Sequence, residues 1–129
     1  MCPGNATAYG EACADELFHG DDPPDAIAAM SDELALGALR AASRTGRAVP
    51  DAVAVTGWDD SDAAAPAGLT TLRQSLRDQG KRCAYIALGL HEPSAGQDPP
   101  SWQVIQRTST RPAGLTDDRA EKPSVCVRR

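Results

Sequence analysis

One stretch of the sequence constrains the fold more than any other: an apolar run at residues 26–30 that leads directly into a helix-forming segment. The run is short, uninterrupted and bounded by turn residues, which predicts a strand buried on both faces within a parallel sheet. Ser31 and Asp32 follow as candidate N-caps, and Glu33 complements the positive end of the helix dipole. The helix that they start is apolar almost all round, so we expect it to be largely covered before it ends at Gly46.

Gly37 lies inside this predicted helix. A glycine there costs about 1 kcal/mol relative to alanine, because its flexible backbone loses more entropy on folding. Since glycine has no Cβ, a second backbone can approach it closely. We therefore expect another segment of the chain to pack against the helix at Gly37.

Helix and strand alternate along the first half of the chain. Residues 5–19 are predicted to form a helix, with Asn5 as its N-cap. Its apolar stripe at helical spacing comprises Ala6, Tyr9, Cys13 and Leu17. A second strand, at residues 53–56, follows the turn at residues 50–51. The order helix, strand, helix, strand predicts an α/β architecture with right-handed crossovers.

The second half of the chain has a less regular pattern. Residues 61–68 are expected to form a loop, and residues 75–90 a third helix that stops before Pro93. The shared face of that helix comprises Leu76, Gln79, Cys83, Ile86, Ala87 and Leu90. Residues 102–105 alternate briefly in polarity and predict a short strand. Residues 111–129 are dominated by Pro, Gly and charged residues, which is typical of a disordered tail.

The composition limits both the core and the choice of partners. Of the 129 residues 41% are hydrophobic, but many of these are alanine and the aromatics are limited to two Trp, two Tyr and one Phe. Little apolar area is therefore available to bury, and we expect a thin core. The net charge is −5 and the basic residues are scattered, which argues against autonomous binding to nucleic acid.

The cysteines and the apolar segments indicate a reducing compartment. The four cysteines show no C-x-x-C spacing, so we expect neither a metal site nor another cofactor. The first residues lack the basic segment and apolar run of a signal peptide, and no stretch approaches the roughly 18 apolar residues that span a membrane. We therefore expect a cytoplasmic protein with reduced thiols and no membrane partner.

Polar residues follow both strands of the predicted parallel sheet. The first strand leads into Ser31 and Asp32, and the second into Gly57, Trp58 and Asp59, with Gly57 expected to let the chain turn. The carboxyl ends of parallel strands meet at one edge, where α/β proteins bind their ligands. Trp58 offers a flat apolar face, and Asp59 can accept hydrogen bonds from two vicinal hydroxyls. This combination suits a sugar or the ribose of a nucleoside.

Other interpretations of these side chains stay open. Asp32 and Asp60 also suit cap and turn positions, and the cap is preferred for Asp32 because Asp is a leading N-cap residue. For Asp59 the ligand role is preferred because of its place at a strand end. His19 and His91 each lie at a helix end and belong to no recognisable triad, and no phosphate-binding loop is present. A small α/β enzyme with Asp59 or Asp60 as its base is therefore the least supported hypothesis.

Four segments together resemble the effector-sensing half of a LacI/GalR-type bacterial transcription regulator. In the right order and spacing, they are residues 26–46, 49–60, 69–74 and 104–110. The resemblance implies a periplasmic-binding-protein-like class I fold over residues 1–110: a three-layer αβα domain with a mainly parallel sheet, here partial and mostly one lobe. The family commonly has Pro-Pro-Leu-Thr-Thr where residues 67–71 read Ala-Gly-Leu-Thr-Thr, which loosens that segment.

The resemblance also implies roles for individual residues. Asp59 matches the aspartate that binds effector hydroxyls, and Trp58 matches the aromatic position before it. Ser31 matches a position where members often have Asn, which implies an altered ligand contact. Gln74 matches a position that lines the cleft in some members. Leu36 matches a dimer-interface position, and an ordinary core role is left open for it.

The implied protein is the C-terminal part of a sensor. The helix-turn-helix, the hinge helix and nearly all of the first lobe find no counterpart, so operator DNA is expected to be reached only through a domain missing from this chain. The helix at residues 75–90 would then lack the lobe on which it packs, leaving an exposed apolar patch. The implied mechanism is closure on a small sugar or nucleoside, which shifts the population of DNA-binding homodimers. The alternative is a stand-alone small-ligand binding or interaction module.

Overall fold

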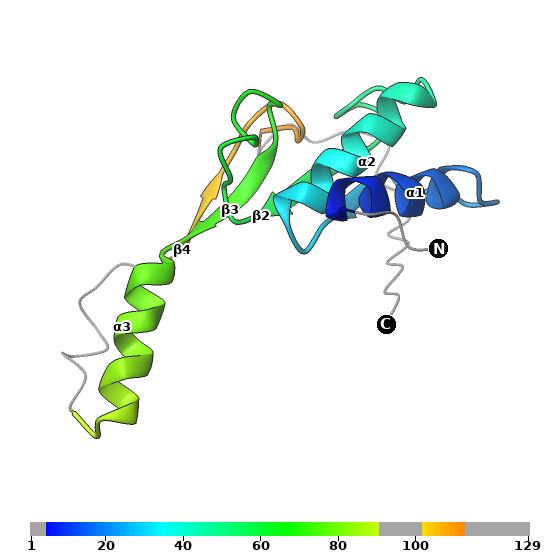
Figure 1. Cartoon of the computed structure of the whole chain (residues 1–129). Helices are drawn as coiled ribbons and strands as arrows, with labels where there is room; N and C mark the ends of the chain where they lie inside the picture. The colour runs from blue at the N-terminus through cyan, green and yellow to red at the C-terminus, as the bar shows by residue number, and fades with distance from the viewer. Residues whose placement is uncertain (1–4, 91–101, 113–129) are drawn as a thin grey trace.

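The computed structural model describes residues 5–90 and 102–112 of the chain. Within these ranges the chain forms α1 (Ala6–Phe18), β1 (Ala26–Ala28), α2 (Asp32–Arg44), β2 (Ala54–Trp58), β3 (Thr70–Gln74), α3 (Leu76–Ala87) and β4 (Trp102–Ile105) (Figure 1). The predicted helices are confirmed, as are the strands expected near the positions of β1, β2 and β4, with shifts of a few residues at their ends. β3 is a strand where the sequence predicted no element.

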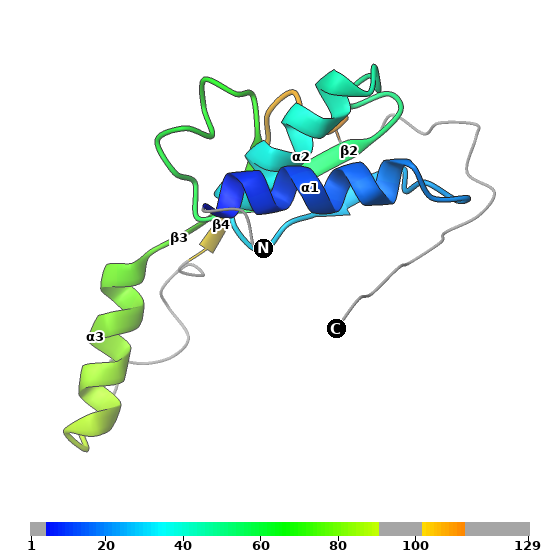
Figure 2. The same cartoon turned by 45° about the vertical axis from the view of Figure 1, so that its right-hand side comes forward.

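The described strands form one sheet in the order β1–β2–β3–β4. β1, β2 and β3 are parallel, with Gly57 opposite Thr71, whereas β4 runs antiparallel to β3, with Val104 opposite Leu72. α2 connects β1 to β2 and packs on the sheet, and α1 packs against α2 (Figures 1 and 2). The predicted α/β class with a mainly parallel sheet is confirmed.

The contact between α1 and α2 depends on two facing glycines, Gly10 and Gly37. A Cβ added to Gly37 would lie 2.5 Å from the backbone N of Glu11 and 2.8 Å from the backbone C of Gly10. A Cβ added to Gly10 would lie 2.8 Å from the Cα of Leu34. Such distances are too short for real carbon atoms, so both positions require glycine. The close backbone approach predicted at Gly37 is confirmed, and its partner is α1.

The buried face of α1 differs from the predicted stripe. Its buried residues are Gly10, Ala14 and Phe18, whereas Tyr9, which belongs to the predicted stripe, is 51% exposed. The predicted stripe of Ala6, Tyr9, Cys13 and Leu17 is therefore wrong by one position around the helix. The reason is the glycine contact, because two backbones approach closely only where small residues face each other.

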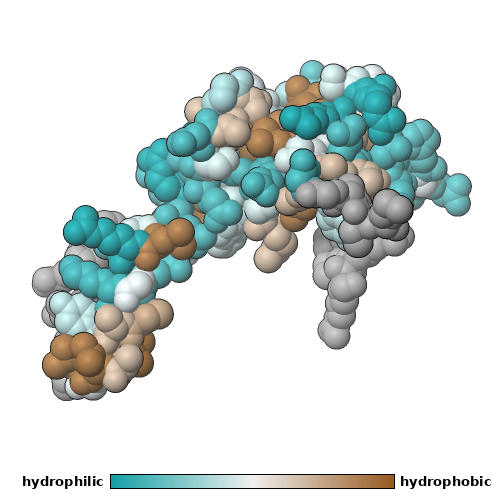
Figure 3. Space-filling model, viewed as in Figure 1, coloured by the Kyte–Doolittle hydropathy of each residue, from teal (hydrophilic) through white to brown (hydrophobic). Residues whose placement is uncertain are grey.

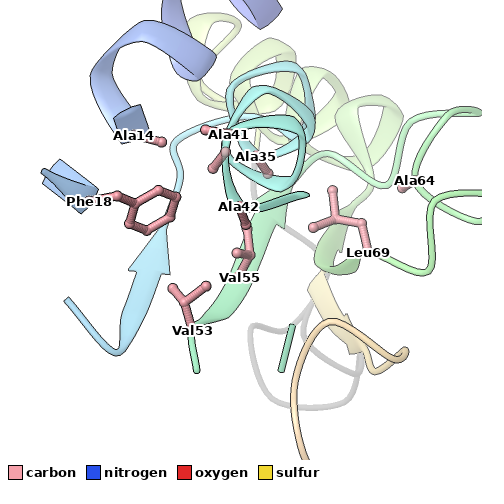
Figure 4. Close-up of a cluster of buried hydrophobic side chains, with 10 residues drawn as sticks. Ala14, Phe18, Ala35, Ala41, Ala42, Val53, Val55, Ala64 and Leu69 are labelled. Carbon is pink, nitrogen blue, oxygen red and sulfur yellow. The ribbon is translucent and has the colours of Figure 1, made fainter. Parts of the chain in front are cut away.

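The hydrophobic core is built mainly from alanine, as the composition suggested (Figure 4). Its buried members are Ala14, Phe18, Ala35, Ala38, Ala41, Ala42, Val53, Val55, Ala64 and Leu69. These residues come from α1, α2, β2 and the segments that flank β2 and β3. Alanine side chains let α2 lie close to the sheet, and the core contains few large side chains that would hold its shape by themselves.

β1 is an edge strand, which corrects the expectation of a strand buried on both faces. In the described residues it pairs with β2 alone. Ala26 and Ala28 are exposed, Ile27 is half-buried, and Met30 beyond the strand is 83% exposed. A short apolar run predicts a strand but does not show on how many sides the strand is covered.

α3 projects away from the sheet (Figures 1 and 2). None of its residues is buried within the described part of the chain. Leu76 is 70% exposed and Ile86 is 72% exposed, and apolar side chains gather at the far end of the helix (Figure 3). The predicted exposed apolar face of this helix is confirmed.

Some predictions fall on residues outside the described ranges, namely His91, Cys2, Cys126 and residues 113–129 of the expected tail. Cys13 and Cys83 are free thiols. Across residues 5–90 and 102–112, no helix has the length and apolar character to cross a bilayer. In the same ranges, no three His, Cys, Asp or Glu side chains are grouped so as to hold a metal ion.

Candidate functional site

The carboxyl end of β2 turns sharply at two aspartates. Trp58 ends the strand, and Asp59 and Asp60 follow with φ angles of 107° and 51°. Positive φ is uncommon outside glycine, although Asp tolerates it better than most residues. The N–H of Asp59 donates to the carbonyl of Leu72 at 2.9 Å, which ties the turn to β3. A turn of this kind persists where the surrounding contacts hold it.

The contacts that hold the turn converge on the carboxylate of Asp60. Its Oδ1 accepts a hydrogen bond from Arg107 Nη2 at 2.7 Å, and its Oδ2 accepts one from Arg73 Nε at 2.6 Å. The side chain is 8% exposed. The hydrogen bond from Arg107, opposed by burial and reinforced by Arg73, holds the pKa of the Asp60 carboxyl below its ordinary value of 3.8. A carboxylate held in this way is a weak base, which argues against a catalytic role for Asp60.

We expect Asp60→Asn to flatten the loss of stability in acid. The folded carboxyl has a lowered pKa, so it contributes stability above the ordinary pKa of 3.8 and loses it as the pH falls through the folded pKa. The free energy of unfolding should fall between about pH 5 and pH 2 in the wild type, and less steeply in the variant. Urea unfolding across this range measures the slopes. Asp62→Asn changes an exposed carboxylate nearby, and an equal flattening in this control would contradict the assignment to Asp60.

Asp32 is buried below the turn, with 1% of its surface exposed. The N-cap of α2 is Ser31, whose Oγ accepts a hydrogen bond from Leu34 N–H at 3.3 Å, so the cap interpretation of Asp32 is wrong. Asp32 Oδ1 accepts from Thr71 Oγ at 2.5 Å, and Oδ2 accepts from Ser61 N–H at 2.6 Å. The side chain therefore joins the start of α2 to β3 and to the loop after β2.

Gly57 makes room for this buried carboxylate. It lies within β2, and a Cβ at this position would collide with Oδ1 of Asp32 and approach Leu69 Cδ2 to 3.0 Å. The expectation that Gly57 lets the chain turn is wrong, because the turn comes two residues later at Asp59. Glycine is needed here for close packing.

Trp58, Asp59 and Gln74 lie at the exposed edge of the sheet. Gln74 is the last residue of β3, and its Nε2 donates to Asp59 Oδ1 at 2.9 Å. Asp59 is exposed, and none of the described residues donates a hydrogen bond to its Oδ2. Trp58 is 41% exposed. The edge thus presents one carboxylate oxygen and one aromatic side chain that a ligand can reach.

Ser31 and Leu36 belong to the start of α2. Ser31 is half-buried, and its hydroxyl oxygen is engaged in the cap described above. Leu36 is half-buried and packs against the core, as the open alternative for this residue proposed. A ligand contact at Ser31 and a dimer contact at Leu36 stay predictions.

Two residues that act on the site were not predicted to belong to it. Arg107 is 17% exposed, and besides Asp60 its guanidinium reaches the carbonyl of Leu69 at 2.7 Å. Gln79 in α3 donates from Nε2 to Gln74 Oε1 at 2.9 Å. An arginine close after an apolar strand is a weak signal of a buried ion pair, and no helical spacing rule pairs Gln79 with Gln74 across the end of a strand.

A mainly parallel sheet with polar residues at the carboxyl ends of its strands is the architecture of ligand-binding α/β domains. Residues 2–110 match the periplasmic binding protein-like domain family, and the chain belongs to this family. Its relatives are LacI-family transcriptional regulators, as the four segments predicted, and the chain is part of an effector-binding domain of that kind. These relatives are regulators rather than enzymes.

Three relatives illustrate the match. The uncharacterised HTH-type transcriptional regulator YvdE of Bacillus subtilis is 38% identical over 96 residues, which are 72% of this chain and 30% of that protein. An uncharacterised protein from Actinobacillus succinogenes has a crystal structure with 30% identity and a TM-score of 0.67, covering 81% of this chain and 40% of that one. A LacI family regulator from Lactobacillus casei, solved with bound sucrose, has 26% identity and a TM-score of 0.64, covering 82% and 41%. The chain spans less than half of each relative.

Proposed function

We propose that this chain forms one side of an effector site for a small polyhydroxylated ligand, a sugar or a nucleoside. The observation that carries the proposal is the exposed carboxylate of Asp59, which Gln74 anchors through one oxygen and which is open at the other, beside the partly exposed indole of Trp58. A carboxylate accepts hydrogen bonds from vicinal hydroxyls. An aromatic face packs against the apolar C–H face of a sugar ring or against a base.

The other predicted site residues have supporting parts in this proposal. Ser31 and Gln74 add polar contacts at the rim of the site. Asp32 holds the loop after β2 in place and does not contact the ligand, because both of its oxygens already accept hydrogen bonds within the protein. The sucrose bound to the Lactobacillus casei relative supports a ligand of the sugar class.

We further propose that ligand binding controls transcription in the complete regulator, in the cytoplasm. A ligand bridging this edge and an opposing lobe would favour one conformation of a homodimer, and so change the fraction able to bind operator DNA. The DNA itself would be bound by a helix-turn-helix domain, for which residues 5–90 and 102–112 provide no counterpart.

We expect Asp59→Ala to weaken ligand binding at least tenfold. The variant removes the acceptor for two hydroxyl groups, and hydrogen bonds to a charged group contribute about 1.5–3 kcal/mol. The measurement is an NMR titration of the Trp58 indole N–H with D-ribose, D-glucose, sucrose and adenosine. The wild-type chain should give saturable shifts with at least one of these, with a Kd on the order of 1 mM because only one side of the ligand is buried.

Asp62→Ala is the matched control, since it removes an exposed carboxylate from the loop that follows the turn. It should leave the titration unchanged. Equal affinity in Asp59→Ala and the wild type would refute the role of Asp59. An absence of saturable shifts with every compound in the panel would refute the proposed ligand class.

A further inference from the structure

We infer that Gln79 of α3 is a positioning residue for the effector site, because it fixes the amide orientation of Gln74 and through it the carboxylate of Asp59. The inference rests on the proposed function, in which Asp59 meets the ligand. It is carried by two consecutive hydrogen bonds of 2.9 Å each. Gln79 Nε2 donates to Gln74 Oε1, and Gln74 Nε2 donates to Asp59 Oδ1.

The direction of this chain of hydrogen bonds is dictated by its last member. At neutral pH a carboxylate only accepts hydrogen bonds, so the part of the Gln74 amide that faces Asp59 must be the NH2 group. The amide oxygen of Gln74 then faces α3 and needs a donor. Gln79 supplies that donor, and an acceptor in its place would set two oxygen atoms against each other.

Gln79 has a firm backbone from which to act. One residue, Ser75, separates β3 from α3, and its Oγ caps the helix by accepting from Asp78 N–H at 3.2 Å. The N–H of Gln79 donates to the carbonyl of Ser75 at 3.0 Å, which closes the first turn. In α3 only Gln79 and Tyr85 are half-buried, and the other residues are exposed. The side chain of Gln79 therefore lies against Gln74 at the end of β3, whereas most other side chains of α3 are exposed.

These two hydrogen bonds fix the orientation of the Asp59 carboxylate in the site. With its Oδ1 held by Gln74, the carboxylate keeps its second oxygen free for ligand hydroxyls. If the Gln74 amide turned over, its oxygen would face the carboxylate and repel it. Ligand affinity thus depends on a residue of α3 that need not touch the ligand.

Three variants of Gln79 separate donation from size. Gln79→Met removes the donor at similar length, Gln79→Glu replaces it by an acceptor, and Gln79→Lys keeps a donor. We expect the Kd for the ligand to rise about threefold in Gln79→Met and about tenfold in Gln79→Glu, and to stay near the wild-type value in Gln79→Lys. The side-chain amide resonances of Gln74, recorded without ligand, should move in the same order.

Ala84→Glu and Ala84→Lys are the charge controls, because they place the same charges at an exposed position of α3. Neither should move the Gln74 amide resonances. If Gln79→Glu moves these resonances no more than Ala84→Glu does, or if the Kd follows charge at both positions alike, the inference is overturned. The resonances recorded without ligand distinguish the two proposals. A displaced Gln74 amide in the Gln79 variants supports the positioning role of Gln79, whether or not a compound binds. An absence of binding to the wild type refutes only the proposed ligand class.

Discussion

Gly37→Ala is expected to lower the free energy of unfolding by about 3 kcal/mol and to loosen α1 from α2. The added Cβ would overlap backbone atoms of Gly10 and Glu11, which move only if the whole of α1 moves. Alanine recovers about 1 kcal/mol of helix propensity, which is too little to offset the overlap. Thermal and urea unfolding followed by circular dichroism measure the change, and the melting temperature should drop by about 10 °C or more.

Gly80→Ala is the matched control for this substitution. It also lies inside a helix, α3, but a Cβ there would meet no atom within 4 Å from the rest of the described residues, beyond the neighbouring backbone of its own helix. We expect Gly80→Ala to stabilise the chain slightly, by up to about 1 kcal/mol, because only helix propensity changes. If both variants shifted stability in the same direction, close packing at Gly37 would not be what holds α1.

The features that could be predicted from the sequence are those set by neighbours in the chain. Ser31 as a cap and Gly37 as a point of close approach follow from local geometry, and both are confirmed. The apolar face of α3 was likewise visible in its periodicity, whereas the exposure of that face was implied by the family resemblance, through the lobe that has no counterpart here. In each case the residue type is demanded by the conformation of its own segment.

The wrong predictions concern features that depend on contacts between elements distant in the sequence. The periodicity of α1 gave a stripe containing Tyr9, but the face that packs is chosen by Gly10 meeting α2. The apolar run of β1 indicated full burial, but the place of a strand in its sheet decides how much of it is covered. The periodicity of one helix or strand does not specify which other element packs against it.

The candidate site shows the same division. Trp58 and Asp59 were predicted because they follow a strand of a parallel sheet. The link between Asp60 and Arg107 was not, since 47 residues separate them and only the return of β4 beside β3 brings them together. The pairing of Gln74 with Asp59 spans 15 residues and depends on β2 and β3 being neighbours.

Arg107→Met is expected to lower the free energy of unfolding by about 3 kcal/mol, because it leaves the largely buried carboxylate of Asp60 with Arg73 as its remaining arginine partner. Methionine keeps the apolar stem of the side chain but donates no hydrogen bond to Asp60 Oδ1 or to the carbonyl of Leu69. Arg73 stays paired with Asp60, but its side chain is 56% exposed and compensates less of the charge. Urea unfolding at pH 7 measures the loss.

A second substitution tests whether the lost pairing is the cause. Asp60→Asn in the Arg107→Met background removes the uncompensated charge, so the double variant should be more stable than Arg107→Met alone. Arg73→Met is the control, and it should cost about 0.5 kcal/mol or less because that arginine is more exposed. A loss in Arg73→Met equal to that in Arg107→Met would contradict the expected dominance of the buried pair.

Arg107→Met should also weaken ligand binding, because Asp60 shares its turn with Asp59. If the double variant regains stability without regaining ligand affinity, the ion pair orients the turn in addition to stabilising the fold.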